Sequence, residues 1–130
     1  MHDAISRTTD GKFRQAIEIG PHSIGSDEPK DAGGDDSAPA PHELLEAALA
    51  ACTSMTVKMY AERKGWPLRS VEVRVHIDKS PEGNVLRRTI RLHGALDEEQ
   101  RVRLLDIAGK CPVHKTLASN RIESSAEVAP

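Results

Sequence analysis

The sequence predicts an α+β fold in a single domain that spans residues 1–130. Three patterns predict it: short strand-like segments before residue 27, helical periodicity from residue 41 to about 64, and apolar alternation from residue 71 to 77. Strands and helices come in separate runs, which is typical of α+β domains. A chain of 130 residues has the usual length of one domain.

The first 27 residues are predicted to form two or three short strands. Asp10-Gly11 and Gly20-Pro21 are turn signals, and apolar residues cluster between them. The following segment, residues 28–40, is rich in Gly, Pro, Asp and Ser, residues that favour turns. We therefore expect residues 28–40 to be a flexible loop.

The clearest helix is predicted from Pro41 to about Lys64. Proline suits the first helical turn, and Gly65-Trp66-Pro67 ends the pattern. The predicted apolar face consists of Leu45, Ala48, Leu49, Cys52, Met55 and Met59. No polar side chain occurs between Ala47 and Cys52, so we expect this helix to be buried, with Cys52 in an enclosed apolar setting.

A hairpin and a capped helix are predicted next. Apolar residues alternate from Val71 to Ile77, residues 81–84 form a turn, and residues 85–92 return as the partner strand. Asp97 is the expected N-cap of a helix, with Gln100 at the spacing of a capping box, and Gly109 is expected to end that helix.

The last part of the chain is predicted to contain a short helix and a strand. Cys111-Pro112 begins the helix, which is expected to run through about Ala118. Arg121 to Val128 then returns as an edge strand.

Composition excludes several classes of partner. The formal net charge is −2, so the chain lacks the basic surface that nucleic acid requires. No apolar run approaches the roughly 20 residues of a membrane-spanning helix, and no signal-peptide pattern occurs, which predicts a cytoplasmic protein without a membrane partner. One Trp, one Tyr and one Phe leave a thin core, which favours an obligate dimer.

The two cysteines are the candidate reactive residues, because cytoplasmic cysteines are more often redox-active or catalytic than structural. Cys111 lies at an expected helix N-cap beside Lys110, His114 and Lys115, which favours a thiolate; the alternative is an unreactive capping residue. Cys52 in an apolar helix would behave as a small hydrophobe unless the fold brings a cation to it.

A metal site is the third possibility for these residues. Cys111 and His114 have an i, i+3 spacing, and Cys52 would be a third ligand. The other histidines are scattered and no CxxC or HxxxH pair occurs, so no metal is expected.

Two segments resemble a known family. Pro41–Val57 resembles the helix that bears the reactive cysteine in the OsmC/Ohr family, and Lys110–Leu117 resembles that family's second-cysteine motif. Residues 59–68, Met-Tyr-Ala-Glu-Arg-Lys-Gly-Trp-Pro-Leu, are similar to the OsmC-like branch. The order of elements between the motifs also matches, so the resemblance covers essentially the whole chain.

The resemblance implies an OsmC-like fold, with antiparallel sheets around a long buried central helix, in an intertwined homodimer. It implies a thiol peroxidase of oxidative-stress defence that reduces organic hydroperoxides more readily than hydrogen peroxide. By this resemblance Cys52 is the peroxidatic thiolate, and its sulfenic acid condenses with Cys111 to a disulfide. An external dithiol then restores both thiols, and no cofactor is required.

One position departs from the family pattern. Where family members often carry a glutamate that pairs with an activating arginine, this chain has His42, with Glu43 adjacent. Arg14 is the candidate arginine, and Arg7 is the second choice. The missing glutamate favours one alternative, a non-enzymatic module that binds a small apolar ligand. A redox sensor, in which the disulfide changes the shape of the protein, is a third possibility.

Overall fold

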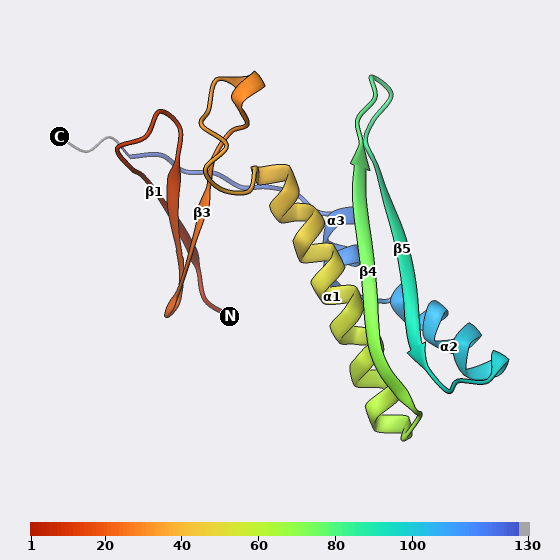
Figure 1. Cartoon of the computed structure of the whole chain (residues 1–130). Helices are drawn as coiled ribbons and strands as arrows, with labels where there is room; N and C mark the ends of the chain where they lie inside the picture. Colours follow the sequence, from red (N-terminus) through yellow and green to blue (C-terminus); the bar gives the residue numbers. More distant parts are fainter. Residues whose placement is uncertain (128–130) are drawn as a thin grey trace. The chain divides into compact units, whose positions relative to one another are not determined.

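The computed structural model describes residues 1–127, which form two compact units. Met1–Ala48 and His76–Leu86 make the first unit; Leu49–Val75 and the chain from Arg87 onward make the second. In chain order the elements are β1 (Ala4–Thr8), β2 (Gln15–Ile19), β3 (His22–Ser26), the 3-10 helix η1 (Lys30–Ala32), α1 (Pro41–Lys64), β4 (Leu68–Asp78), β5 (Val85–Gly94), α2 (Glu98–Ala108) and α3 (Pro112–Ala118) (Figure 1). The α+β prediction is confirmed.

The first unit contains an antiparallel sheet in the order β1-β2-β3. Ile17 in the middle strand pairs with Ser6 on one side and with Ile24 on the other. Gly20 has a φ of 58° in the turn between β2 and β3, a left-handed conformation that favours glycine. The prediction of two or three short strands is confirmed.

The loop from residue 28 to 40 is anchored to the end of β3 by Asp27. The buried Asp27 carboxylate accepts hydrogen bonds from the Ser37 hydroxyl at 2.6 Å, the Ser37 amide at 3.1 Å and the Glu28 amide at 2.8 Å. The hydrogen bonds from Ser37 hold the pKa of Asp27 below its usual value. Ser26 adds a hydrogen bond from its hydroxyl to the Pro39 carbonyl at 2.8 Å.

The predicted buried face of α1 is correct for Leu49 and wrong for Met55 and Met59. Its buried residues recur every fourth position and are Leu49, Thr53, Val57 and Ala61. Met55 and Met59 are 62% and 63% exposed, and Ala47 and Ala51 are exposed as well. The prediction followed the largest apolar side chains, including the two methionines. The helix instead buries a row of mostly smaller side chains, one in every four residues. Thr53 fits there because its hydroxyl donates to the Leu49 carbonyl at 2.7 Å.

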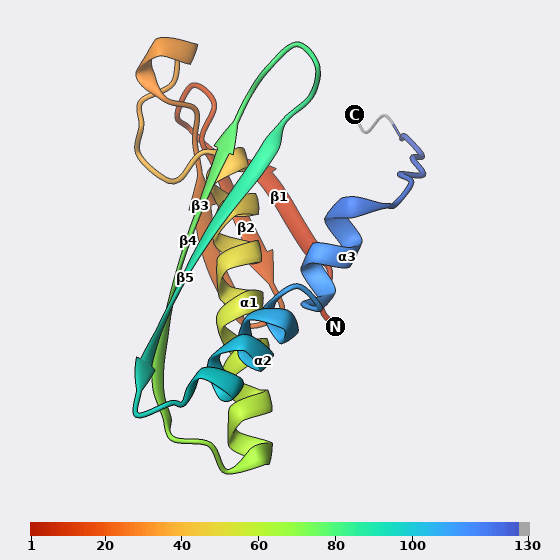
Figure 2. The same ribbon diagram turned by 90° about the vertical axis from the view of Figure 1, so that its right-hand side faces the viewer.

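The core of the second unit is formed by α1, α2 and the β4–β5 hairpin (Figure 2). Its buried residues are Val57, Ala61, Leu68, Leu104 and Ala108. The predicted capping box of α2 is confirmed: the Asp97 side chain accepts from the Gln100 amide at 2.8 Å, and the Gln100 side chain accepts from the Asp97 amide at 3.1 Å. Gly109 is the C-cap, as expected.

The end of the chain confirms one prediction and corrects another. Cys111 is the N-cap of α3, which spans the predicted residues Pro112–Ala118. Residues 121–127 form no strand, so the predicted edge strand is wrong over this range, and Val128 lies outside the described residues. Ile122 is 93% exposed, so the segment lacks a buried face that would hold it in a sheet.

Candidate active site

The structure brings the two cysteines together. Cys52 is partly exposed on α1, whereas Cys111 is 0% exposed at the start of α3. Both are free thiols, and the Cys52 side chain is close enough to Cys111 to help lower the pKa of its thiol. The long helix and the Lys-Cys-Pro turn therefore contribute one sulfur each to a single site.

Cys111 is surrounded by hydrogen-bond donors. Burial raises the pKa of the Cys111 thiol, but hydrogen bonds from the Cys52 side chain, the His114 amide, the Thr53 side chain and the Val113 amide outweigh it. The pKa of Cys111 is consequently lower than that of an ordinary cysteine. The His114 amide lies 3.4 Å from the Cys111 sulfur. This arrangement favours an ionised Cys111 in the reduced pair.

Arg88 on β5 is a site residue that the sequence analysis missed. Its Nη1 donates to the Thr53 hydroxyl oxygen at 3.1 Å, and its Nη2 lies 3.1 Å from Nδ1 of His114. Arg88 is half-buried on the same side of β5 as Ile90 and Leu92. The residues between them, at positions 89 and 91, are exposed, as is residue 87. A charged residue at one of the alternating positions that are otherwise apolar in a strand is the sequence signal that could have identified Arg88.

The contact with Arg88 occupies Nδ1 of His114. Arginine has only donors, so Nδ1 is the atom that accepts in a hydrogen bond between the two side chains. A metal ion at Nδ1 would meet the positive charge of the guanidinium. Among residues 1–127 no group of three or more histidine, cysteine, aspartate or glutamate side chains is arranged to hold a metal ion.

The lysines near the cysteines in sequence are engaged with other groups. Lys110 forms an ion pair with Asp106 of α2, with Nζ 3.4 Å from the carboxylate oxygen. Lys58 donates from Nζ to the Leu68 carbonyl at 2.8 Å. Arg88, which is distant from both cysteines in the sequence, is a cation that the fold brings to Thr53 and His114, the neighbours of the two cysteines.

The residues predicted to support thiolate activation lie in the first unit. Arg14 donates from Nη1 to the Ser37 carbonyl at 2.8 Å and to the Ser37 hydroxyl at 2.9 Å. Glu43 accepts from the Ala40 amide at 2.8 Å, at the start of α1, and His42 is exposed in the first turn. Arg7, the second choice, pairs with Glu18 at 3.1 Å. The activating roles of Arg14, His42 and Glu43 stay predictions.

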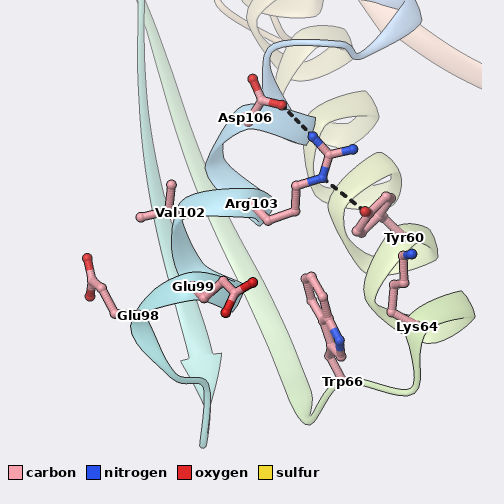
Figure 3. A pocket seen from close by; sticks show the side chains of 8 residues that line it. All are labelled: Tyr60, Lys64, Trp66, Glu98, Glu99, Val102, Arg103 and Asp106. Atoms are coloured by element: carbon pink, nitrogen blue, oxygen red, sulfur yellow. Dashed lines mark hydrogen bonds and ion pairs between the residues drawn. The ribbon is translucent and has the colours of Figure 1, made fainter.

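A separate hollow of about 850 Å³ lies between α1 and α2 (Figure 3). It is lined by Tyr60, Lys64, Trp66, Glu98, Glu99, Val102, Arg103 and Asp106. Arg103 donates from Nε to the Tyr60 hydroxyl oxygen at 3.0 Å and from Nη1 to Asp106 at 2.9 Å. The hydrogen bond from Arg103 lowers the pKa of Tyr60. Neither cysteine lines this hollow.

Known proteins resemble the chain in sequence and in fold. The family model for OsmC-like proteins matches residues 34–126. An OsmC-like protein from Mycoplasma pneumoniae is similar in structure, with a TM-score of 0.77 and 20% identity over 91% of this chain and 87% of that one. The organic hydroperoxide resistance protein OsmC of Legionella pneumophila has a TM-score of 0.66 and 20% identity over 92% of both chains.

The organic hydroperoxide resistance protein OhrB of Bacillus subtilis has a TM-score of 0.63 and 21% identity, again over 92% of both chains. No curated protein sequence matches the chain. The family match covers most of the sequence, both cysteines included, and the structural neighbours share the fold. The chain belongs to the OsmC-like family.

Proposed function

We propose that this protein is a cysteine-based thiol peroxidase that reduces organic hydroperoxides, with hydrogen peroxide as a poorer substrate. The observation that carries the proposal is that Cys52, partly exposed, and Cys111, buried, share one site in which Cys52 helps to lower the pKa of the Cys111 thiol. An accessible thiol is able to meet a peroxide, and a buried neighbour is positioned to react with the product. The Legionella and Bacillus proteins of the same fold are organic hydroperoxide resistance proteins, which supports this substrate class.

The proposed cycle begins at Cys52. Its thiolate attacks the terminal oxygen of the hydroperoxide, the O–O bond breaks, and the alkoxide leaves and takes a proton to become an alcohol. Cys52 is then a sulfenic acid. The Cys111 thiolate attacks the Cys52 sulfur, which forms the disulfide and releases water. An external dithiol restores both thiols by exchange and is itself oxidised to a disulfide.

We also propose that the active protein is a homodimer. Cys52, Met55 and Met59 recur at i, i+3 and i+7 and so share one face of α1. Both methionines are more than 60% exposed in the single chain, which is unusual for large apolar side chains on one helix face. A second copy of the chain would bury them and shield the reactive sulfur from water.

Turnover tests the proposed function. Catalytic amounts of the protein are mixed with cumene hydroperoxide and dithiothreitol, and hydroperoxide consumption is followed over many equivalents. We expect sustained consumption by the wild type and its loss in Cys52→Ser, because serine does not form the sulfenic intermediate. Val102→Ala is the control, since Val102 is exposed on α2, outside the face that carries Cys52.

The alternatives predict different outcomes of this assay. A redox sensor would consume one equivalent of hydroperoxide and stop, and a ligand-binding module would consume none.

Among residues 1–127 no helix has the length and apolar character to cross a membrane. The cytoplasm, where dithiol reductants are present, is the proposed location of the cycle.

A further inference from the structure

Arg88 occupies a position where a charge lowers stability unless a partner compensates it. It is half-buried in β5, in phase with the apolar Ile90 and Leu92. Removing a guanidinium from water costs several kcal/mol in general, and a buried arginine is normally paired with a carboxylate. A cation at such a position therefore needs an anion close by.

No carboxylate supplies that anion within the described residues. The polar contacts of Arg88 in residues 1–127 are with the Thr53 hydroxyl and with Nδ1 of His114, neither of which is an anion. Both residues also adjoin Cys111: the His114 amide lies 3.4 Å from its sulfur, and Thr53 is among the groups that lower the pKa of its thiol. Thr53 and His114 therefore connect Arg88 to the Cys111 thiolate, which is the anion of this site.

The two residues hold the surroundings of the sulfur in place. The guanidinium donates to the Thr53 oxygen, whose own proton goes to the Leu49 carbonyl, so the hydroxyl is fixed from both sides. At His114 the guanidinium contacts Nδ1, which keeps the residue in place while its backbone amide donates to Cys111. The hydrogen bond from this amide favours the ionised sulfur.

We propose that Arg88 is a positioning residue for the second step of the cycle: it holds Thr53 and His114 so that the Cys111 sulfur stays ionised for attack on the Cys52 sulfenic acid. In that step the Cys111 sulfur donates an electron pair to the Cys52 sulfur, the S–S bond forms and the S–O bond breaks. The oxygen leaves as hydroxide and takes a proton from solvent to become water. Fast closure protects Cys52 from a second oxidation to sulfinic acid.

This inference rests on the proposed function for its biological role, but it has a test that needs no peroxide. In a Cys52→Ala background Cys111 is the single thiol, and the ultraviolet absorbance of its thiolate is titrated against pH. We expect Arg88→Met to lower the thiolate fraction at neutral pH about tenfold. Arg91→Met is the matched control, because Arg91 lies on the same strand, exposed, beside Glu72. It should leave the titration unchanged.

The second test uses both cysteines. The reduced protein receives hydroperoxide in steps, and mass spectrometry measures the sulfinic acid at Cys52 against the Cys52–Cys111 disulfide. We expect Arg88→Met to raise the sulfinic fraction several-fold and Arg91→Met to leave it at the wild-type level. Arg88→Lys keeps the charge but not the fork that reaches both Thr53 and His114, so it should give an intermediate result.

The outcomes separate the two proposals. An unchanged thiolate titration in a folded Arg88→Met protein, judged by circular dichroism, would overturn the role of Arg88 whatever the peroxidase activity. Should Arg88→Met not fold, a wild-type titration in Arg88→Lys would overturn it equally. A shifted titration in a protein that does not consume hydroperoxide would keep the role of Arg88 in ionising Cys111 and would refute the proposed function alone.

Discussion

The Thr53 hydroxyl, 0% exposed on α1, accepts a hydrogen bond from Nη1 of Arg88 at 3.1 Å. The same hydroxyl donates to the Leu49 carbonyl at 2.7 Å, and Thr53 is among the groups that lower the pKa of Cys111. A polar residue takes the place of an apolar one on the buried face of α1, and the thiol site is built around it.

Removing this hydroxyl should destabilise the fold. Thr53→Val keeps the shape of the side chain but leaves the Arg88 donor without its acceptor, and an unsatisfied buried donor costs about 1–3 kcal/mol. Thr53→Ser keeps the hydroxyl and loses one methyl group, for about 0.5–1.5 kcal/mol. Urea unfolding of the reduced proteins measures both. Equal stability of Thr53→Val and the wild type would contradict the role given to the hydroxyl.

The reduced protein should become more stable, relative to Cys111→Ser, as the pH rises. Because the pKa of Cys111 is lowered in the fold, the unfolded chain binds more protons between the lowered pKa and the ordinary thiol value. The contribution is full above the ordinary pKa, about 8.5, and is lost as the pH falls through the lowered pKa. Cys111→Ser is the reference because the serine hydroxyl still accepts the hydrogen bond from the His114 amide, whereas it does not ionise in this pH range.

The measurement is the difference in free energy of unfolding between the wild type and Cys111→Ser, both reduced, from pH 5 to above 8.5. We expect a difference that grows with pH in favour of the wild type. A difference that is constant over this range would mean that Cys111 titrates alike in the folded and the unfolded chain.

Shortening a core side chain of α2 should lower the free energy of unfolding far more than shortening an exposed side chain of the same helix. Leu104 is 0% exposed between α1 and the hairpin, so Leu104→Ala should lower the free energy of unfolding by about 2–5 kcal/mol. Val102 is 58% exposed, and Val102→Ala should change it by about 0.5 kcal/mol or less. Thermal or urea unfolding of the pair checks this, and similar losses in both variants would contradict the assigned core.

A charge on the exposed face of α1 should weaken the proposed dimer. Met59→Lys places an ammonium where a second copy is expected to pack, and desolvating it opposes association. Light scattering of the purified protein over a dilution series gives the molar mass. We expect a dimer for the wild type and monomer for Met59→Lys, with Val102→Lys on α2 as the control. A monomeric wild type would refute the dimer.

Local patterns predicted the elements of this fold well, because they depend on neighbouring residues. Asp97 with Gln100, Gly109 and Cys111-Pro112 mark helix ends by hydrogen-bond geometry that spans only a few residues. Part of the buried face of α1 was predicted wrongly because it depends on which elements pack against the helix. Periodicity gives the spacing of a face but not the partner that covers it.

The candidate site was predictable in part. The two cysteines stand out by type and motif, and the fold places their sulfurs in one hydrogen-bonded site. Arg88 did not stand out, since it reaches Thr53 and His114 through tertiary packing and no local motif surrounds it. Its position in phase with Ile90 and Leu92 was the one local signal. The lysine beside Cys111 was a weaker guide, because Lys110 pairs with Asp106.

The most direct test of the account is the fate of the two sulfurs after one equivalent of cumene hydroperoxide. Peptide mapping of the reduced wild type should find Cys52 joined to Cys111, and Cys111→Ser should stop at a sulfenic acid that dimedone traps on Cys52. Cys52→Ser should leave the hydroperoxide unconsumed. A sulfenic acid trapped on Cys111 in Cys52→Ser, formed at the wild-type rate, would contradict the assignment of Cys52 as the residue that attacks the peroxide.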